Sequence, residues 1–407
     1  MENKKFGLIG KTLKHSYSKI IHQKLGCYPY ELFELTSDRL KGFVESDITG
    51  FNVTIPYKKD VMQFADEVHP FALSIGAVNT VIKRDGKVLA FNTDFNGMIY
   101  MLSRAEIVLK NKCVMILGSG GTSNTAKAVA EYLGAKKITV VSRSGKINYE
   151  NCYDLVDTEI IINTTPVGMY PNVDSAPIDL GGFSNICGVV DVIYNPNLTK
   201  LLYQARKKGI KYTSGLSMLV AQAKYAKDIF FNEKTPDNVI ENVLSEISKE
   251  TLNVVLIGMP GSGKSTVGNI LSQKLNRELI DTDSEIVKRE GRSIPEIFEE
   301  SGEKYFRQVE SEVLREVGKL SGKIIATGGG VVKNSDNYFP LKCNGKIFHI
   351  NRSIEKLETD GRPLSKDLNA LKKLYNERKD LYKQFADFTV ENNNIIDDAV
   401  KGVLENL

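Results

Sequence analysis

Short apolar runs alternate with amphipathic stretches along much of the chain. The runs Lys112–Leu117 and Val254–Ile257 each have the length of one buried strand. Apolar residues at helical spacing follow both runs, over about 122–133 and from Val267 to Leu275. Because single strands alternate with helices in this way, we expect an α/β fold for the whole chain.

Further elements are expected on both sides of residue 250. The segment between Ile75–Thr80 and Phe91–Gly97 predicts a hairpin that turns at Asp85-Gly86. Thr235 and Pro236 predict the N-cap and first position of a helix, and 248–252 reads as a short link. Strands are expected at Phe6–Gly10, Asp47–Pro56, Lys137–Val141, Ile160–Asn163, Gly188–Ile193, Lys211–Thr213, Leu279–Asp283, Ile324–Thr327 and Lys346–Ile350. Helices are expected at Lys19–Leu25, from Met98 onward, at Leu198–Lys208, at Met218–Phe231 and around Arg378.

Composition places the chain among ordinary soluble globular proteins. Its 407 residues predict two or three domains, with 42% hydrophobic and 26% charged residues. The net charge of +4 is small, and no basic or aromatic array points to nucleic acid. The five cysteines are scattered, and neither a signal-peptide core nor an apolar run of membrane-spanning length is present. We therefore expect a cytoplasmic protein with reduced thiols and no membrane association.

A phosphate-binding loop follows the strand at Val254–Ile257. Residues 258–265 match G-x-x-x-x-G-K-[ST] at every fixed position, between a strand and a helix. The glycines let backbone N–H groups turn towards an anion at the helix N-terminus. Lys264 is expected to reach the outer phosphates of a nucleotide, and the Ser265 hydroxyl to coordinate magnesium.

A second glycine-rich loop follows the strand at Lys112–Leu117. Gly118-Ser119-Gly120-Gly121 opens the helix at 122–133, which is a variant of the dinucleotide-binding fingerprint. The next strand ends at Ser142-Arg143-Ser144, with no acidic residue for a ribose hydroxyl. An arginine there favours the extra phosphate of NADP, although a surface charge is the plain alternative.

Several polar residues at strand ends are weaker candidates. Lys58 emerges where a strand stops at Pro56, and Asp94 follows an Asn-Thr pair. Ser16 and Ser18 flank a tyrosine just after the first strand. On spacing alone, Lys58 reads as a solvated lysine, Asp94 as an N-cap and the two serines as turn or cap residues.

Taken together, the motifs of residues 1–248 resemble shikimate dehydrogenase. The chain contains, in the family's order, KHSYS, NVTIPYK, GAVNT, NTDFNG, GSGGT, NTTPVGM, DVIYNP and GLSMLVAQA. The resemblance implies a substrate domain at 1–97 and about 218–248, and a Rossmann NADP domain at about 98–217. It also implies that Lys58 and Asp94 are the catalytic pair. The shikimate-binding residues that it implies are Ser16, Ser18, Thr54, Asn79, Asp94, Tyr194 and Gln222. The implied NADP contacts are Gly118, Ser119, Gly120, Gly121, Thr122, Ser142, Arg143, Ser144, Val192 and Gly215.

Residues 251–407 resemble shikimate kinase. The phosphate loop is followed by DTD, GEKYFR, ATGGG, RPL and ER-x-x-LY. The resemblance implies that Asp283, Arg307, Gly329 and Arg378 bind shikimate, and that Asp283 accepts a proton. It also implies that Asp281 joins Ser265 at Mg²⁺, and that Arg362 is a lid arginine closing on ATP. The implied nucleotide contacts are Gly261, Ser262, Gly263, Lys264, Ser265, Thr266 and Arg362. The lid segment is short, since only Pro363–Glu377 separates Arg362 from Arg378.

The two resemblances together imply one bifunctional enzyme of aromatic precursor synthesis. Its first half would reduce 3-dehydroshikimate to shikimate with NADPH, and its second half would phosphorylate shikimate with ATP and Mg²⁺. Two alternatives are kept: a first half that uses NAD with quinate or shikimate, and one half retained as a non-catalytic binding module. All substrates would be small molecules, and the oligomeric state stays open.

Overall fold

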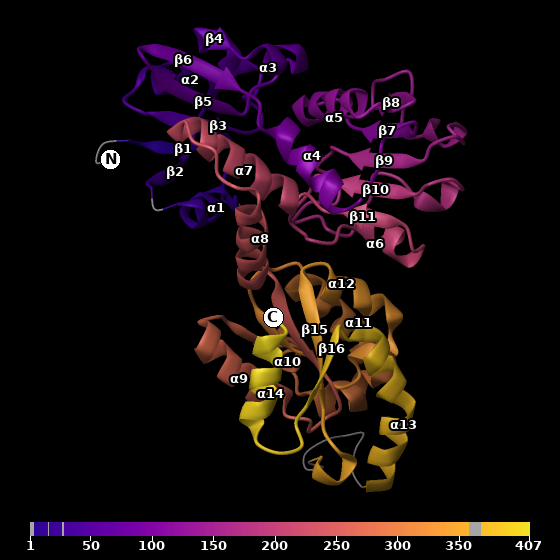
Figure 1. Ribbon diagram of the computed structural model, residues 1–407. Coiled ribbons are helices and arrows are strands. Elements are labelled where there is room, and N and C mark those ends of the chain that lie inside the picture. The colour runs from indigo at the N-terminus through magenta and orange to yellow at the C-terminus, as the bar shows by residue number, and fades with distance from the viewer. Residues whose placement is uncertain (1–3, 15, 27, 358–367) are drawn as a thin grey trace. The chain divides into compact units, whose positions relative to one another are not determined.

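The computed structural model describes residues 4–14, 16–26, 28–357 and 368–407 (Figure 1). The chain divides into two compact units, Met1–Ile247 and Ser248–Leu407. Three sheets carry the architecture, two in the first unit and one in the second. Among the described residues, no helix has the length and apolar character needed to cross a membrane.

The first sheet of the first unit has six strands of mixed direction. β1 pairs in parallel with β2 and β3, whereas β5 pairs antiparallel with β3 and β6. The strands in sheet order are β2 (Tyr30–Glu34), β1 (Phe6–Gly10), β3 (Gly50–Val53), β5 (Thr80–Arg84), β6 (Lys87–Phe91) and β4 (Glu67–Val68). The hairpin between β5 and β6 turns at Asp85 and Gly86, which both have positive φ, so that prediction is confirmed. The helices that accompany this sheet are α1 (Ser18–Leu25), α2 (Leu40–Glu45), α3 (Pro70–Ile75), α4 (Asp94–Arg104), α7 (Leu216–Phe231) and α8 (Asn238–Thr251).

The second sheet is entirely parallel. Its order is β11 (Lys211–Thr213), β10 (Gly188–Asp191), β9 (Ile160–Asn163), β7 (Cys113–Leu117) and β8 (Lys137–Val141). Helices α5 (Gly121–Tyr132) and α6 (Lys200–Lys207) belong to this region. Alternate residues of β7 enter two different cores, Val114 and Ile116 one, Met115 and Leu117 the other. A strand buried on both faces explains why this segment is apolar without interruption.

The second unit contains one parallel sheet with helices on both faces (Figure 1). Its order is β13 (Leu279–Asp281), β14 (Ile324–Ala326), β12 (Asn253–Ile257), β15 (Gly345–Asn351) and β16 (Phe388–Glu391). The helices are α9 (Lys264–Leu275), α10 (Thr282–Glu290), α11 (Ile294–Gly318), α12 (Tyr338–Lys342), α13 (Leu368–Phe385) and α14 (Ile396–Glu405). The α/β fold expected for the whole chain is therefore confirmed. Short 3₁₀ helices lie at Ser37–Arg39, Asp60–Phe64, Cys152–Asp154, Leu180–Gly182, Val331–Lys333, Ser335–Asn337 and Ile354–Lys356.

Helix α4 begins at Asp94, four residues before the expected start at Met98. The Asn92 side chain accepts a hydrogen bond from the Phe95 N–H at 3.2 Å and thereby stabilises the earlier start. Gly97 is not a helix-initiating residue: a Cβ there would lie 2.8 Å from the Met218 carbonyl oxygen. The glycine instead allows α4 to approach α7 closely, and the two helices pack side by side (Figure 1).

Helix α8 also differs from expectation at both ends. It begins at Asn238, because Thr235 is held elsewhere: its N–H donates to Asp228 and its hydroxyl accepts from Lys227. The helix then continues to Thr251, so most of the expected link at 248–252 is helical. The prediction that Thr235 and Pro236 start this helix is therefore wrong.

Strand β13 ends at Asp281, two residues earlier than expected. The Asp281 carboxylate accepts hydrogen bonds from the N–H groups of Asp283 and Ser284, and so caps α10. Asp283 consequently lies in the first turn of α10 rather than at the end of a strand.

Candidate active sites

The ammonium group of Lys58 and the carboxylate of Asp94 form an ion pair in the first unit. Lys58 Nζ donates to Asp94 Oδ2 at 2.5 Å, and the two side chains are 15% and 9% exposed. Lys58 follows the end of β3, and Asp94 is the first residue of α4. The structure thus brings together two residues that are 36 positions apart and that spacing alone described as a solvated lysine and a cap.

The amide of Asn79 fixes the orientation of Asp94. Asn79 Nδ2 donates to Asp94 Oδ1 at 2.9 Å and to Gln222 Oε1 at 3.3 Å. Its Oδ1 accepts from the Thr93 N–H at 2.7 Å, which determines which end of the amide faces Asp94. Asn79, Asp94 and Gln222 are all buried, so the expected set forms one polar cluster at the β5, α4 and α7 elements.

The other residues that are expected to bind the substrate lie on other elements of the first unit. Ser18 is buried at the start of α1, and its N–H donates to the Ser16 hydroxyl at 3.3 Å. Thr54 follows β3 directly and is partly buried. The Tyr194 ring packs against Tyr17, with ring centres 5.1 Å apart.

The glycine-rich loop lies between β7 and α5 with an exposed backbone. Gly118 has a φ of 107°, a conformation that favours glycine, and its N–H donates to the Val141 carbonyl. No atom of the described residues lies within 4 Å of a Cβ placed on Gly120. A Cβ on Gly121 would lie 3.9 Å from Lys58 Cδ, so this loop reaches the Lys58–Asp94 pair. Ser119 is exposed and Thr122 partly buried in the first turn of the helix.

The expected NADP-selecting residues lie after β8. Arg143 and Ser144 are exposed, Ser142 is partly buried, and Arg143 has no ion pair among the residues that the structure describes. An exposed guanidinium without an acidic partner is available for an anionic ligand.

Gly215 and Val192 are in close contact at the neighbouring strand ends. A Cβ on Gly215 would lie 1.9 Å from the Val192 carbonyl oxygen, and the Gly215 N–H donates to Ile193. Asp191, the first residue of the DVIYNP motif, anchors this edge although no role was expected of it. Its carboxylate accepts from Thr199 at 2.7 Å and from Asn163 at 3.1 Å, and burial raises its pKa to about 6.

A cavity of about 560 Å³ occupies the second unit beside the phosphate loop. Its polar lining holds nearly every residue expected there: Gly261, Gly263, Lys264, Ser265, Thr266, Asp281, Asp283, Arg307, Gly329 and Arg378. Its apolar lining includes Phe298 and Phe306, whose rings are 4.7 Å apart. A pocket with apolar walls and a few convergent charged groups is typical of a small-molecule site.

The phosphate loop has the conformation that the motif predicts. Gly261 and Gly263 have φ values of 80° and 92°. Lys264 Nζ donates to the carbonyl oxygens of Gly258 and Met259 at 2.9 Å each. Ser262, within the loop, is buried, and Thr266 is exposed at the start of α9. The Ser265 hydroxyl donates to Asp281 Oδ2 at 2.9 Å, which places a hydroxyl and a carboxylate side by side.

Two arginines of the expected site line this cavity. Arg378, on α13, is 2% exposed and donates from Nη1 to the Gly329 carbonyl at 3.0 Å. Its Nε and Nη2 are buried without a hydrogen-bond partner among the described residues. Arg307 donates to Glu310 at 2.8 Å and to Glu303 at 3.2 Å. Unpaired guanidinium N–H groups facing a cavity are suited to a carboxylate ligand. Arg362 lies outside the described residues.

Comparison with known proteins identifies the family of each unit. A family model for the shikimate dehydrogenase substrate-binding domain matches residues 8–81. A shikimate dehydrogenase (NADP(+)) from Caldicellulosiruptor bescii is 39% identical over 283 residues, covering 61% of this chain and 95% of that protein. The chain belongs to the shikimate dehydrogenase family.

Solved structures extend this family likeness to the fold. Shikimate dehydrogenase 1 from Peptoclostridium difficile is 34% identical, with a TM-score of 0.57 over 60% of this chain and 97% of that one. Shikimate 5-dehydrogenase from Thermus thermophilus, solved with NADP(H) and shikimate, is 27% identical with a TM-score of 0.53, over 60% and 99%. The first unit of this family member therefore has the fold of the shikimate dehydrogenases.

The family member carries a second enzyme at its C-terminal end. A model described as shikimate kinase matches residues 260–407. The match contains most of the phosphate loop and all of the cavity's arginines and carboxylates. A shikimate kinase domain thus follows the shikimate dehydrogenase part in one chain.

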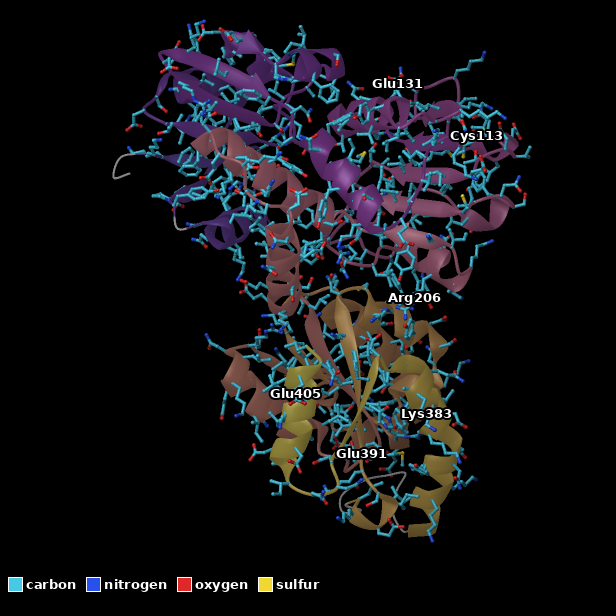
Figure 2. All side chains as sticks on the ribbon, in the orientation of Figure 1. Cys113, Glu131, Arg206, Lys383, Glu391 and Glu405 are labelled. Carbon is cyan, nitrogen blue, oxygen red and sulfur yellow. The ribbon has the colours of Figure 1, made fainter. Side chains whose placement is uncertain are left out.

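Glu310 lines the kinase cavity, and Tyr382 contacts another lining residue, Gly329; the sequence assigned neither of them a role. Glu310 is 1% exposed, and burial raises its pKa against the opposing effect of Arg307. The Tyr382 hydroxyl donates to the Gly329 carbonyl at 2.5 Å, and its ring stacks on His349. Burial and the nearby cations Lys264 and Lys383 lower the His349 pKa to about 4; Lys383 lies on α13 (Figure 2). Tyr382 is the tyrosine of the ER-x-x-LY motif, although no role was assigned to it, whereas Glu310 stands in none of the motifs.

Proposed function

We propose that this chain catalyses two consecutive reactions, reduction of 3-dehydroshikimate to shikimate and phosphorylation of shikimate to shikimate 3-phosphate. The main support is that each unit contains its own set of the polar residues that its reaction would need. Lys58 and Asp94 lie beside a dinucleotide loop in one unit, and Lys264, Asp283 and Arg378 line one cavity in the other. The dehydrogenase would span 1–248 and the kinase 251–407.

In the dehydrogenase, Lys58 would act as the acid–base group. Bound NADPH would supply the hydride for the ketone carbon, and negative charge would then develop on the ketone oxygen. The Lys58 ammonium would donate a proton to this oxygen, while Asp94 holds the ammonium and hydrogen-bonds the same substrate. Ser16, Ser18, Thr54, Asn79, Tyr194 and Gln222 would bind the substrate carboxylate and hydroxyls.

The NADP site would extend from the loop at Gly118–Thr122 to the segment after β8. Exposed N–H groups at the start of α5 suit a pyrophosphate, and the exposed Arg143 suits a 2′-phosphate. Parallel measurements with NADPH and NADH, and with quinate as substrate, test this assignment. Faster turnover with NADH than with NADPH would instead support the alternative in which the first unit uses NAD.

In the kinase, Arg378 and Arg307 would bind the shikimate carboxylate, and Gly329 would contact its ring. Asp283 would accept the proton of the attacking hydroxyl as its oxygen bonds to the γ-phosphorus and ADP leaves. Lys264 and the loop N–H groups would hold the phosphates, and Arg362 would close on them. The adjacent oxygens of Ser265 and Asp281 fit Mg²⁺, which keeps few protein ligands and several waters.

One coupled run on the purified full chain tests the proposal. The chain receives 3-dehydroshikimate and NADPH, NADPH loss is followed, and Mg-ATP is then added while ADP and shikimate 3-phosphate are measured. We expect both signals. Lys58→Ala should lose the first signal by about 100-fold or more, in the range of general acid–base catalysis, and should keep kinase activity on supplied shikimate.

Each outcome addresses a separate part of the proposal. NADPH loss without phosphate transfer refutes the kinase assignment. No NADPH loss, together with phosphate transfer once shikimate is supplied, refutes the dehydrogenase assignment. Binding of both substrates without turnover supports the binding-module alternative for that unit. Lys58→Ala with most of its turnover intact excludes Lys58 as the acid–base group.

A further inference from the structure

Arg352 is a cation beside the phosphate loop that belongs to none of the motifs. It directly follows strand β15, which pairs with β12, the strand that leads into the loop. Its side chain lines the same cavity as Gly261, Lys264 and Ser265. Arg352 Nη1 donates to the Gly261 carbonyl at 3.4 Å, a long hydrogen bond.

The charge of Arg352 is not neutralised by any acid in the described part of the chain. Other arginines of the kinase unit, including Arg289, Arg292 and Arg307, pair with glutamates. Arg352 forms no such pair among the described residues, and its Nε is buried without a hydrogen-bond partner there. The acids on the cavity wall include Asp281, which accepts from Ser265, and Glu310, which accepts from Arg307.

A partly buried guanidinium held only by a neutral carbonyl is poorly compensated. Burying a charge without a counter-ion is unfavourable, and a bound anion removes that cost. The loop whose carbonyl holds Arg352 also presents its N–H groups to phosphate. Lys264 and Arg352 are thus both hydrogen-bonded to carbonyl oxygens of the same loop. Both cations are therefore close to an anion bound by this loop.

We propose that Arg352 binds the outer phosphates of the nucleoside triphosphate in the kinase site. The inference rests on the proposed function, because it assumes that the loop holds ATP. Arg352 acts there as a phosphate-binding residue with a planar, two-pronged donor set, which a lysine does not reproduce.

The test uses the full chain and three variants. Arg352→Met keeps the aliphatic stem, Arg352→Lys keeps the charge, and Arg315→Met is the matched control. Arg315 is an exposed arginine of α11 outside the cavity lining. Calorimetry measures binding of a non-hydrolysable ATP analogue, ADP and AMP with Mg²⁺, and steady-state assays measure KM for ATP and for shikimate.

We expect Arg352→Met to weaken the ATP analogue about tenfold or more, in line with loss of a hydrogen bond between charged groups. AMP binding and KM for shikimate should stay within about twofold, and Arg315→Met should match the unaltered chain. Arg352→Lys should recover part of the affinity.

Two results would overturn the inference. One is an Arg352→Met chain that binds the ATP analogue as tightly as the unaltered chain. The other is an equal loss for AMP, which would place the contact on the nucleoside or reveal a merely structural role. If the unaltered chain does not phosphorylate shikimate, the proposed function is wrong. That result comes from the unaltered chain alone and does not depend on any Arg352 variant.

Discussion

Asn79 offers a quantitative test of how the dehydrogenase pair is oriented. Its side chain is 2% exposed, donates to Asp94 at 2.9 Å and accepts from the Thr93 N–H at 2.7 Å. Replacing it with alanine removes a hydrogen bond to a charged carboxylate and leaves a buried N–H without its partner. We expect the first loss to lower kcat/KM and the second to lower the free energy of unfolding.

The catalytic loss can be estimated from the first of these contacts. A hydrogen bond to a charged group contributes about 1.5–3 kcal/mol, which corresponds to about 10- to 150-fold in rate if Asp94 needs it in the transition state. The orphaned Thr93 N–H should destabilise the first unit by about 1–3 kcal/mol. We therefore expect kcat/KM for NADPH-dependent reduction to fall by at least tenfold in a protein that still folds.

Asn253→Ala is the matched control, because Asn253 is an equally buried amide in the other unit. It donates to Leu320 at 2.7 Å and accepts from the Lys323 N–H at 2.8 Å. This variant should lose comparable stability in unfolding experiments while its dehydrogenase kcat/KM stays unchanged. A folded Asn79→Ala chain whose kcat/KM lies within threefold of the unaltered value would refute the orienting role of Asn79.

Two further predictions concern the strand ends of the NADP domain. Gly215→Ala should destabilise the first unit by about 1–3 kcal/mol and raise KM for NADPH, because the added Cβ would collide with the Val192 carbonyl. An unchanged melting temperature and an unchanged KM would contradict this prediction. Burial raises the Asp191 pKa to about 6 in the folded chain, against 3.8 ordinarily. The folded state therefore holds more protons between these values, so its stability should fall by up to about 3 kcal/mol as pH rises from 4 to 6. Urea unfolding across this range should show that slope in the unaltered chain and not in Asp191→Asn; equal slopes would show that another group causes it.

The two nucleotide loops were predictable because each is local in sequence. A strand, a glycine loop and a helix follow one another within about 25 residues, and the geometry depends on backbone freedom at positions such as Gly118 and Gly263. The apolar runs of β7 and β12 likewise identify strands covered on both faces. In these segments the local pattern and the tertiary structure demand the same conformation.

Other features depend on contacts between distant segments and could not be read locally. The early start of α4 requires the Asn92 side chain, and the close approach at Gly97 becomes apparent only when α7 is in place. Strand β16 escaped notice because only Val390 among its four residues is buried. The importance of Glu310 comes from Arg307 and from its burial, neither of which spacing can show.

Helix α8 contains residues of both units, because the boundary between the units falls between Ile247 and Ser248. Its apolar stripe, which includes Ile240, Val243 and Ile247, is part of a core of the first unit. Its last turn is bonded within the second unit, where Arg277 donates to the Lys249 and Leu252 carbonyls and Gly322 donates to Thr251.

No flexible loop therefore marks where one enzyme stops and the other starts. A protease will find no easy site between Asn238 and Thr251, because cleavage requires local unfolding of this helix. Anyone who wishes to prepare the two enzymes separately should let both shortened proteins keep the whole helix, since either would otherwise lose part of its own fold.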